Sequence, residues 1–329
     1  MIVAVNNSFG NRFKITIFGA SHAEEVGIII EGLPAGIKLD EERFMADLDR
    51  RRPRLKGETP RRESDTPHIE GLDADGCTTG KALRISFINK NIRSYDYDHL
   101  RRQPRPSHAD LVQLRKYGDD YDISGGGIAS GRMTVALVAA GVVAKQMLKG
   151  VEFNTRLVEV GGESDPRKFD DIIKVAAAEG NSVGGVIECS ISGIKEPLGE
   201  PFFDSVESVM AHLLFSIPAV KGVEFGDGFA GTRKRGSERN DAIVDASGAT
   251  LSNNEGGING GIANGNDIVV RVAIKPTPSI SIVQHTYDFE HGFSPLLIGG
   301  RHDSCIARRA QVVVEAMAAV ALADLKLQL

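Results

Sequence analysis

Two histidines stand where an imidazole could move a proton. His22 follows a strand and a turn of small residues in FGASHAEEVGIIIEG. His108 lies in the proline-stiffened loop RPSHAD, together with Arg105 and Asp110. Imidazole titrates near neutral pH, and beside an arginine it is suited to acid catalysis at an anion. A structural histidine and an ordinary surface loop are the alternatives for these two segments.

A dense run of basic residues lies between positions 43 and 62. Such a run is able to hold a polyphosphate or to flank an active site. Its members are Arg43, Arg50, Arg51, Arg52, Arg54, Lys56, Arg61 and Arg62. A solvated basic helix end is the alternative, because cations near a helix C-terminus are favoured electrostatically.

Glycine is frequent, with 37 residues, and much of it is clustered, which suggests backbone placed close to ligands. In SGGGIASGRMT a glycine run enters a predicted helix. This arrangement presents backbone N–H groups and the positive helix end to a phosphate. The segment has neither the GKS or GKT of a Walker A loop nor a GxGxxG dinucleotide fingerprint, so it indicates an anion site of another kind.

Two further segments lie late in the chain. Lysine, threonine and serine occupy positions 275, 277 and 279 after a strand, and Arg301, His302 and Asp303 stand before the last helix. At such positions anions are gripped by side chains and backbone amides. Asp303 is either a base or a helix-capping carboxylate, and capping is the commoner role.

Composition bounds the class of protein. The 329 residues are 41% hydrophobic and 25% charged, which is globular, and the net charge of -5 argues against a nucleic-acid binder. Three cysteines at no zinc-site spacing are read as reduced thiols, and no metal is expected. The first residues do not resemble an export signal, and the apolar stretch 311–325 carries two acidic residues, so we expect a cytoplasmic protein with no membrane partner.

The periodicity of apolar residues predicts α+β structure. Alternating patterns predict strands over RFKITIFG, ALRISFI, GGVIECSISGI, DIVVRVAIKP and SISIVQH. Capping residues and apolar spacing predict helices over 41–51 behind Asp40, 132–149, 165–179, 204–215 and 306–326. Because strands and helices alternate irregularly, antiparallel sheets fit better than a doubly wound parallel sheet. We expect one domain over residues 1–329.

Taken together and in order from residue 18 to residue 320, these segments resemble the chorismate synthase family. FGASH, GGGIASGR and GRHDSC correspond to the family signatures FGESH, GGGRSSAR and GRHDPC. Ala20 replaces the usual Glu, and Ile128 replaces an Arg where an anionic ligand is expected. Other segments that match are RRRP, NxxxRSxDY (Asn89, Arg93, Ser94, Asp96, Tyr97), RPxHAD, SIPAVKG, GGIxGGIxNG and KPTxSI.

The resemblance implies the family's fold and reaction. The fold is a β-α-β sandwich with helices between antiparallel sheets, usually assembled as a homotetramer. The reaction converts 5-enolpyruvylshikimate 3-phosphate to chorismate by an anti-1,4 elimination of phosphate, the last common step to the aromatic amino acids. It requires reduced FMN although there is no net redox change. NADPH, acting through a separate reductase, is the expected reductant.

The resemblance also assigns roles to residues of this chain. His108 would protonate the departing phosphate, His22 would protonate or stabilise the reduced flavin, and Asp303 would help to move the proton lost from the substrate. Arg51, Arg105, Arg132 and Arg301 would hold the anionic groups of the substrate, and Arg51 and Lys56 would contact NADP. The expected FMN contacts are Ala129, Ser130, Pro218, Ala219, Gly260, Lys275, Pro276, Thr277, Pro278, Ser279 and Arg301.

Two other functions stay open from the sequence. A catalytically weakened homologue that binds flavin or a phosphorylated ligand would explain the cation lost at Ile128, but the retained proton-handling residues oppose it. A nucleic-acid binder would explain the basic run between positions 43 and 62, but the net charge opposes it.

Overall fold

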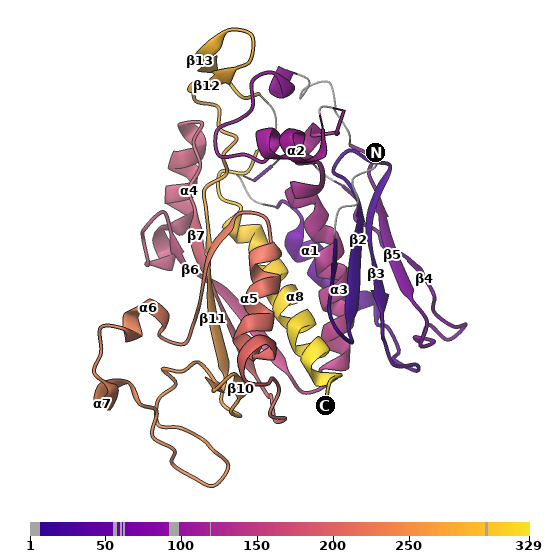
Figure 1. Cartoon of the computed structure of the whole chain (residues 1–329), viewed down its shortest axis with the longest axis vertical. Coiled ribbons are helices and arrows are strands. Elements are labelled where there is room, and N and C mark those ends of the chain that lie inside the picture. Colours follow the sequence, from indigo (N-terminus) through magenta and orange to yellow (C-terminus); the bar gives the residue numbers. More distant parts are fainter. Residues whose placement is uncertain are drawn as a thin grey trace.

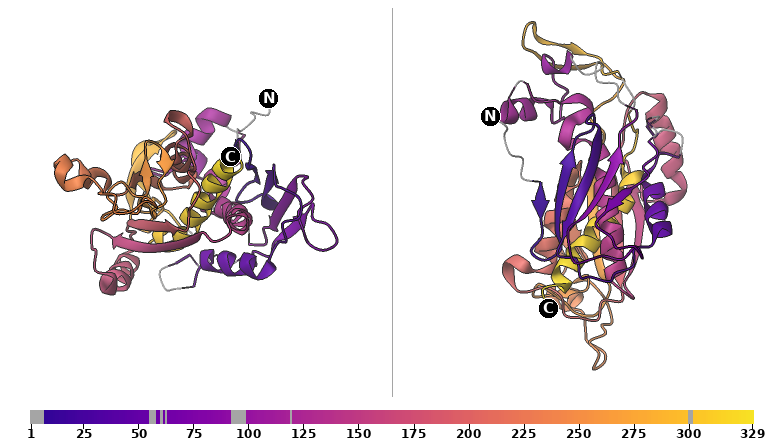
Figure 2. Two further views of the ribbon diagram at one scale, coloured as in Figure 1. Left: turned by 90° about the horizontal axis from the view of Figure 1, so that it is seen from below. Right: turned by 90° about the vertical axis from the view of Figure 1, so that its right-hand side faces the viewer.

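Two antiparallel sheets form the outer layers of the molecule, and long helices fill the space between them (Figures 1 and 2). No helix in the described part of the chain is long and apolar enough to cross a membrane. The computed structural model describes residues 7–54, 58–59, 61, 63–91, 99–118, 120–299 and 302–329.

The first sheet has the strand order β1-β2-β3-β5-β4. Strands β2 and β3 pair from Lys14 with Glu31 to Gly19 with Val26, so the turn that carries His22 lies at one end of this sheet. The strands are β1 (Ser8–Phe9), β2 (Lys14–Gly19), β3 (Glu25–Glu31), β4 (His68–Glu70) and β5 (Leu83–Ile88).

The second sheet has the order β6-β7-β11-β8. Its central strand β7 buries every second residue, which is the pattern of a sheet with one face on the core. The strands are β6 (Glu152–Val160), β7 (Gly185–Ser192), β8 (Val220–Phe225) and β11 (Ile268–Ile274). Two hairpins add β9 (Ile258–Asn259) with β10 (Ile262–Ala263) and β12 (Gln284–Asp288) with β13 (Gly292–Leu296).

Helices α3 (Thr134–Met147) and α8 (Ala307–Lys326) form the centre of the sandwich. Both bury residues on all sides, as expected of helices enclosed by other elements. Helix α3 contacts β3 and β5, α8 contacts β6 and β7, and the two helices pack on each other. The predicted α+β class with helices between antiparallel sheets is therefore confirmed. The other helices are α1 (Glu41–Arg51), α2 (Asp110–Tyr117), α4 (Phe169–Ala178), α5 (Val206–Ser216), α6 (Gly228–Gly231) and α7 (Gly236–Arg239).

Local sequence signals placed most of these elements correctly. All five predicted helices are present, and Asp40 caps α1 by accepting hydrogen bonds from the backbone N–H groups of Glu42 and Arg43. Four of the five predicted strands are present as β2, β5, β7 and β11. The strand predicted over SISIVQH is wrong, because pairing begins only at Gln284. The hydroxyl of Ser279 instead accepts a hydrogen bond from Arg105, which directs this segment away from a sheet.

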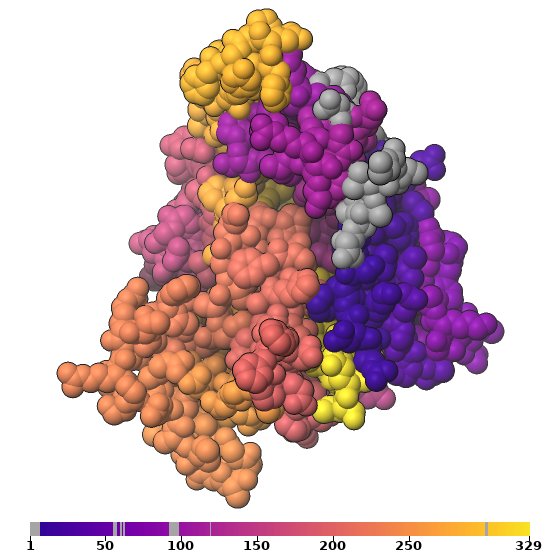
Figure 3. All heavy atoms as spheres, viewed as in Figure 1, coloured from indigo at the N-terminus to yellow at the C-terminus, as the bar shows by residue number. Residues whose placement is uncertain are grey.

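Two segments project from the sandwich. The β12–β13 hairpin stands out at one end, above α2, and the chain between β8 and β9 forms an excursion at the other end (Figure 3). Large apolar side chains are exposed on both segments, among them Phe229 and Leu251 on the excursion and Phe293 on the hairpin. These side chains are available for contacts with other molecules.

Helices α3 and α8 approach closely at Gly141 and Ala316. A Cβ atom on Gly141 would lie 2.3 Å from the Cβ and 2.4 Å from the Cα of Ala316. Real Cβ atoms do not approach a backbone atom so closely, so the absence of a side chain at Gly141 sets the distance between the helices.

Replacing Gly141 with alanine should lower the free energy of unfolding by about 2 kcal/mol or more, because overpacking outweighs the roughly 1 kcal/mol by which alanine favours a helix. Urea unfolding followed by circular dichroism measures this, since the chain has no Trp. Gly236→Ala is the control, because a Cβ there meets no atom within 4 Å. Equal stability of the two variants would contradict the close approach.

Candidate active site

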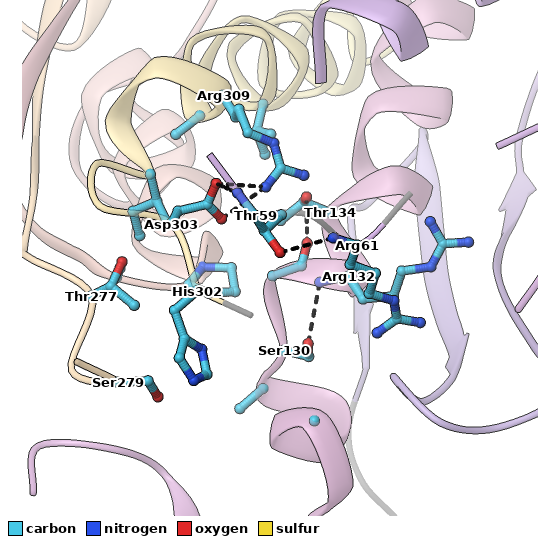
Figure 4. A pocket seen from close by; sticks show the side chains of 18 of the residues that line it. Thr59, Arg61, Ser130, Arg132, Thr134, Thr277, Ser279, His302, Asp303 and Arg309 are labelled. Carbon is cyan, nitrogen blue, oxygen red and sulfur yellow. Dashed lines mark hydrogen bonds and ion pairs between the residues drawn. The ribbon is translucent and has the colours of Figure 1, made fainter. Parts of the chain in front are cut away.

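A cavity of about 430 Å³ brings together most of the side chains that the sequence singled out (Figure 4). It lies where α3 and α8 begin and where α1 and α5 end, so four helix ends meet around it. The segment after β11 and the loop before α2 complete its walls. The predicted site residues that line it are Arg51, Arg105, His108, Ala129, Ser130, Arg132, Pro218, Ala219, Lys275, Thr277, Pro278, Ser279 and Asp303.

Five predicted site residues are not placed on its walls. Lys56 and Arg301 lie outside the described residues. Gly260 lies in the β9–β10 turn beside the start of α5, at the opposite end of that helix from the cavity. Pro276 sits between two residues that line the cavity without lining it itself. His22 lies behind the glycine run rather than on the surface of the cavity.

His108 belongs to a buried network that starts from Asp110. The Nδ1 atom of His108 lies 2.7 Å from Oδ1 of Asp110, whose carboxylate is fully buried at the first position of α2. Arg105 donates to both oxygens of the same carboxylate, from Nη2 at 2.7 Å and from Nε at 2.8 Å. The remaining nitrogen, Nη1, donates to Ser279 at 3.0 Å. The network thus joins the RPSHAD loop to the segment after β11.

Burial and neighbouring cations disfavour a charged imidazole in this cavity. Burial lowers the pKa of His108 below its ordinary 6.5, the bond to Asp110 opposes this, and Arg105 and Lys275 add to the lowering. Burial also lowers the pKa of His302, whose Nε2 lies 3.0 Å from the carbonyl oxygen of Gly299. Both rings are therefore mostly neutral at pH 7, and an anion entering the cavity would favour their protonated forms.

The glycine run passes between the two predicted catalytic histidines. Gly125, Gly126 and Gly127 all have positive φ, at 60°, 92° and 55°. A Cβ atom would lie 2.7 Å from His22 Nε2 at Gly125 and 3.6 Å from His108 Cε1 at Gly126. Only glycine fits this path, which then enters α3 at the cavity as predicted.

Two arginines that line the cavity share one buried carboxylate. Arg51 and Arg132 each donate to a different oxygen of Asp65, and Arg132 Nε also donates to Asn89 at 2.8 Å. Burial lowers the pKa of Arg51 to about 10, and Asp65 opposes this. Burial alone would raise the pKa of Asp65, but the two guanidinium groups hold it below its ordinary 3.8. All three groups are charged at neutral pH.

Asp303 does not cap the last helix. It accepts hydrogen bonds from Arg309 Nη1 at 2.8 Å and from the backbone N–H of Thr59 at 2.9 Å, whereas Ile306 occupies the N-cap position of α8. In Figure 4 the Asp303 carboxylate faces Arg309 and Thr59 at one side of the cavity, and the His302 ring points toward Ser279 and Ser130. Capping was the wrong alternative for Asp303.

Several residues with roles in this network were not assigned one from the sequence. Asp65 lies in no recognisable motif and adopts a positive φ of 46°. Asp110 and His302 stand inside motifs that were noticed but were given no role there. The partners of Asp110 are Arg105 and His108 of the same motif, and His302 contacts the backbone carbonyl of Gly299. Arg61 donates to Glu63 and to the hydroxyl of Ser21, so one member of the basic run reaches the turn beside His22.

The basic run therefore has mixed roles. Arg51 is buried at the cavity, whereas Arg50 turns away from it and pairs with the buried Glu315 of α8 at 2.7 Å. Lys145 of α3 pairs with the same carboxylate, so this cluster fastens α1, α3 and α8 together. Arg43 is exposed on α1 and pairs only loosely with Asp40, as a solvated helix residue does.

The cavity suits an anionic ligand with an apolar part. Among its described lining residues, seven are Arg or Lys and three are Asp or Glu. Four buried polar atoms of described residues that line the cavity have no hydrogen-bond partner, namely Arg51 Nε, Arg52 Nε, Arg132 Nη2 and Thr277 Oγ1. Such atoms are costly unless something bonds them. The ends of α5 and α8 contribute an apolar wall of Ile217, Pro218, Ala219, Ile306, Ala310 and Val313.

Comparison with known proteins agrees with the motifs. A family model for chorismate synthase matches residues 13–327. A chorismate synthase from Chitinophaga pinensis is 51% identical, covering 98% of this chain and 96% of that protein. A chorismate synthase from Dehalococcoides mccartyi is 41% identical, covering 98% and 97%. A crystal structure of chorismate synthase superposes with a TM-score of 0.75 at 27% identity, covering 97% of this chain and 93% of that one.

Replacing Asp65 with asparagine should lower the free energy of unfolding at pH 7 by about 3 kcal/mol, because two buried guanidinium groups lose their partner. The folded-state pKa of Asp65 is lowered, so its contribution is present above the unfolded pKa and is lost as pH falls. The difference between the variant and the wild type should therefore shrink below about pH 4.

Urea unfolding at pH 7 and pH 3 tests both statements. The control is Asp171→Asn, since Asp171 is exposed and pairs with Lys174 only within α4; its effect should stay within about 0.5 kcal/mol at either pH. A deficit in the Asp65 variant that did not change with pH would show that packing, and not charge, accounts for it.

Proposed function

Because this chain belongs to the chorismate synthase family of carbon–oxygen lyases, we propose that the cavity at the four helix ends is its active site. The enzyme eliminates phosphate from 5-enolpyruvylshikimate 3-phosphate and gives chorismate. That substrate carries two carboxylates and a phosphate, and basic side chains dominate the cavity. The observation that carries the proposal is that His108, Arg51 and Arg132 all line this one cavity.

Arginine is the appropriate residue for this substrate. Its planar fork matches a carboxylate or phosphate in two bonds and keeps its charge when buried. Arg51 and Arg132 each use part of their donors on Asp65 and leave a buried nitrogen without a partner. We propose that these nitrogens, with Arg105 on the other side, orient the substrate in the cavity. The role expected of Arg301 stays a prediction.

The residues present fit a reduced flavin mononucleotide. The unpartnered Thr277 hydroxyl and Lys275 stand on the segment after β11, opposite the start of α3. The wall at the ends of α5 and α8 offers apolar surface to a ring system. When bound, reduced FMN supplies electron density to the substrate and recovers it without net redox change. We propose Ala129, Ser130, Pro218, Ala219, Lys275, Thr277, Pro278 and Ser279 as the residues that hold it.

Proton transfer falls to three residues in this proposal. His108 donates a proton to the departing phosphate, since it alone of the predicted histidines lines the cavity beside cations. Asp303, held between Arg309 and Thr59, would accept the proton that leaves the substrate ring. His22, behind the glycine run, would hold a proton at that side of the site and stabilise a reduced flavin bound there. One C–O bond and one C–H bond break, and one carbon–carbon double bond forms.

A weakened homologue is the alternative function, and the position of its motivating residue opposes it. Among the described residues, Ile128 does not line the cavity. Ala20 does not line it either. The cation lost relative to the family signature is therefore absent from the end of the glycine run and not from the walls that would meet the substrate.

Three expectations stay predictions. The source of electrons for FMN, with NADPH acting through a separate reductase, concerns Lys56, which lies outside the described residues. The cytoplasmic location rests on the sequence. The homotetramer is supported by the exposed apolar side chains of the β12–β13 hairpin and of the excursion after β8.

With reduced FMN under anaerobic conditions, the protein should release one phosphate for each chorismate and consume no net reducing equivalents. The reason is that the cofactor returns to its starting state in each turnover. Phosphate released and flavin oxidised are measured together over many turnovers. Release that stopped after one equivalent of oxidised flavin would indicate a conventional redox reaction, and no release at any flavin concentration would favour the weakened homologue.

Replacing His108 with alanine should lower kcat by about 10²- to 10⁴-fold with a small change in KM, because general acid catalysis typically contributes that much. Steady-state phosphate release at saturating substrate gives the value. His68→Ala is the matched control, since His68 is exposed on β4 in the first sheet. Equal rates for the His108 variant and the wild type would remove this residue from the mechanism.

A further inference from the structure

We propose that Asp110 is a positioning residue that holds His108 with its proton on Nδ1 and turns a bare Nε2 toward the cavity. The inference rests on the proposed function for its catalytic meaning, because His108 is the acid of that proposal. The tautomer of His108 does not depend on the proposed function and can be measured without it.

Both oxygens of the Asp110 carboxylate are occupied by hydrogen bonds. Oδ2 accepts from the backbone N–H of Arg105 at 3.1 Å and from Arg105 Nε at 2.8 Å. Oδ1 accepts from Arg105 Nη2 at 2.7 Å and lies 2.7 Å from His108 Nδ1. Four contacts fix the plane of a carboxylate that has no exposed surface, so it cannot rotate without breaking several of them.

The direction of the bond to His108 follows from the charge of Asp110. Burial would raise the pKa of Asp110, but the bonds from Arg105 and His108 hold it well below its usual range, so it is ionised at neutral pH. An ionised carboxylate only accepts hydrogen bonds. The Nδ1 atom of His108 must therefore donate, and a neutral ring then carries no proton on Nε2.

The surroundings of the ring show where Nε2 points. A Cβ atom on Gly126 would lie 3.6 Å from Cε1 and 3.8 Å from Nε2 of His108, so this edge of the ring faces the glycine run. His108 itself lines the cavity, and about a fifth of its side chain (19%) is exposed there. The nitrogen available to a ligand is thus the one that Asp110 leaves unprotonated.

This tautomer limits how His108 can act as an acid. A neutral His108 of this tautomer has no proton to give from Nε2 and must gain one first. The charged and titratable groups that face it are Asp110, Arg105, Lys275 and His302, and only the first favours the imidazolium. A phosphate dianion in the cavity offsets the cations, so binding of the substrate draws the second proton onto Nε2. Asp110 then stabilises the resulting charge.

The tautomer is tested in the wild-type protein without any ligand, and a variant is needed only to assign the signal. Nitrogen-15 NMR of protein labelled at histidine distinguishes the two ring nitrogens, and His108→Gln assigns the signal among the eight histidines. We expect neutral His108 to be protonated at Nδ1 and bare at Nε2. A ring protonated mainly at Nε2, or an even mixture of the two forms, would overturn the proposal. The measurement needs no turnover, so it separates this inference from the function of the cavity.

Two substitutions test the catalytic part. Asp110→Asn should lower kcat by about 100-fold or more, with little change in KM, because removal of a carboxylate that fixes the tautomer of a catalytic imidazole has effects of this size. It should also shift the alkaline limb of the kcat profile to lower pH, because the protonated form of His108 is the active one and its pKa loses its only raising partner. Asp110→Glu should restore part of the rate. An unshifted profile would reduce Asp110 to a structural residue.

Asp288→Asn is the matched control. Asp288 is buried to a similar degree, accepts a bond from Arg102 at 3.1 Å and lies 3.4 Å from His291 Nδ1, but it belongs to the β12–β13 hairpin and does not line the cavity. Asp288→Asn removes a buried Asp–Arg–His contact that is away from the cavity, so it should leave kcat and its pH profile unchanged. A fall in kcat as large as that of Asp110→Asn would assign the effect to general destabilisation.

Discussion

The structure of the site depends on the pairing of buried guanidinium groups with a few carboxylates. Arg51, Arg105 and Arg132 are each at most 6% exposed, and an unpaired charge at such depth would be very costly. Asp65 serves two of them and Asp110 serves the third. Because each arginine has more donors than its carboxylate uses, the pairing keeps the charge in place and leaves donors for a ligand.

This pairing also explains why the sandwich is built as it is. The arginines come from the end of α1, the loop before α2 and the segment that leads into α3. Of their carboxylates, Asp65 lies in an irregular segment and Asp110 is the first residue of α2. Only a rigid centre brings such distant pieces to one place. That centre is the contact of α3 with α8, where Gly141 and Ala316 let the backbones approach, and the Glu315 cluster, which fixes α1 against both.

The sequence predicted the elements whose signals are local. Helix caps and apolar spacing located α1, α3, α4, α5 and α8, and alternation located β2, β5, β7 and β11. It missed β3, where EVGIIIE is apolar on both faces, and β6, where EFNTRLVEV alternates with polar residues in a way that a loop also shows. It also missed α2, which is short and has no capping side chain at Ala109. These elements are fixed by their neighbours more than by their own residues.

The same division holds for the site. Residues in recognisable motifs, such as His108, Ser130 and Lys275, came together around the cavity, since each motif ends an element that meets the others there. Asp65 could not be found in this way, because its role depends on two arginines that are 14 and 67 residues away along the chain. Gly260 was predicted at the site but lies away from the cavity. Its glycine motif identifies a turn between two strands, but it does not say which part of the molecule that turn is near.

The effect of a departure from the family signature depends on how deeply the replaced residue is buried. An arginine at a half-buried position beside a glycine run and a fully buried arginine paired with a carboxylate contribute differently to a site, because the dielectric surroundings differ. This chain has Ile128 at the first kind of position and keeps the second kind at Arg51, Arg105 and Arg132. The positive charges that this chain retains are the buried ones, which need partner carboxylates in the fold. Loss of Asp65 or Asp110 would therefore disturb the site more than the absence of a cation at position 128, although neither aspartate is needed to bring positive charge to the substrate.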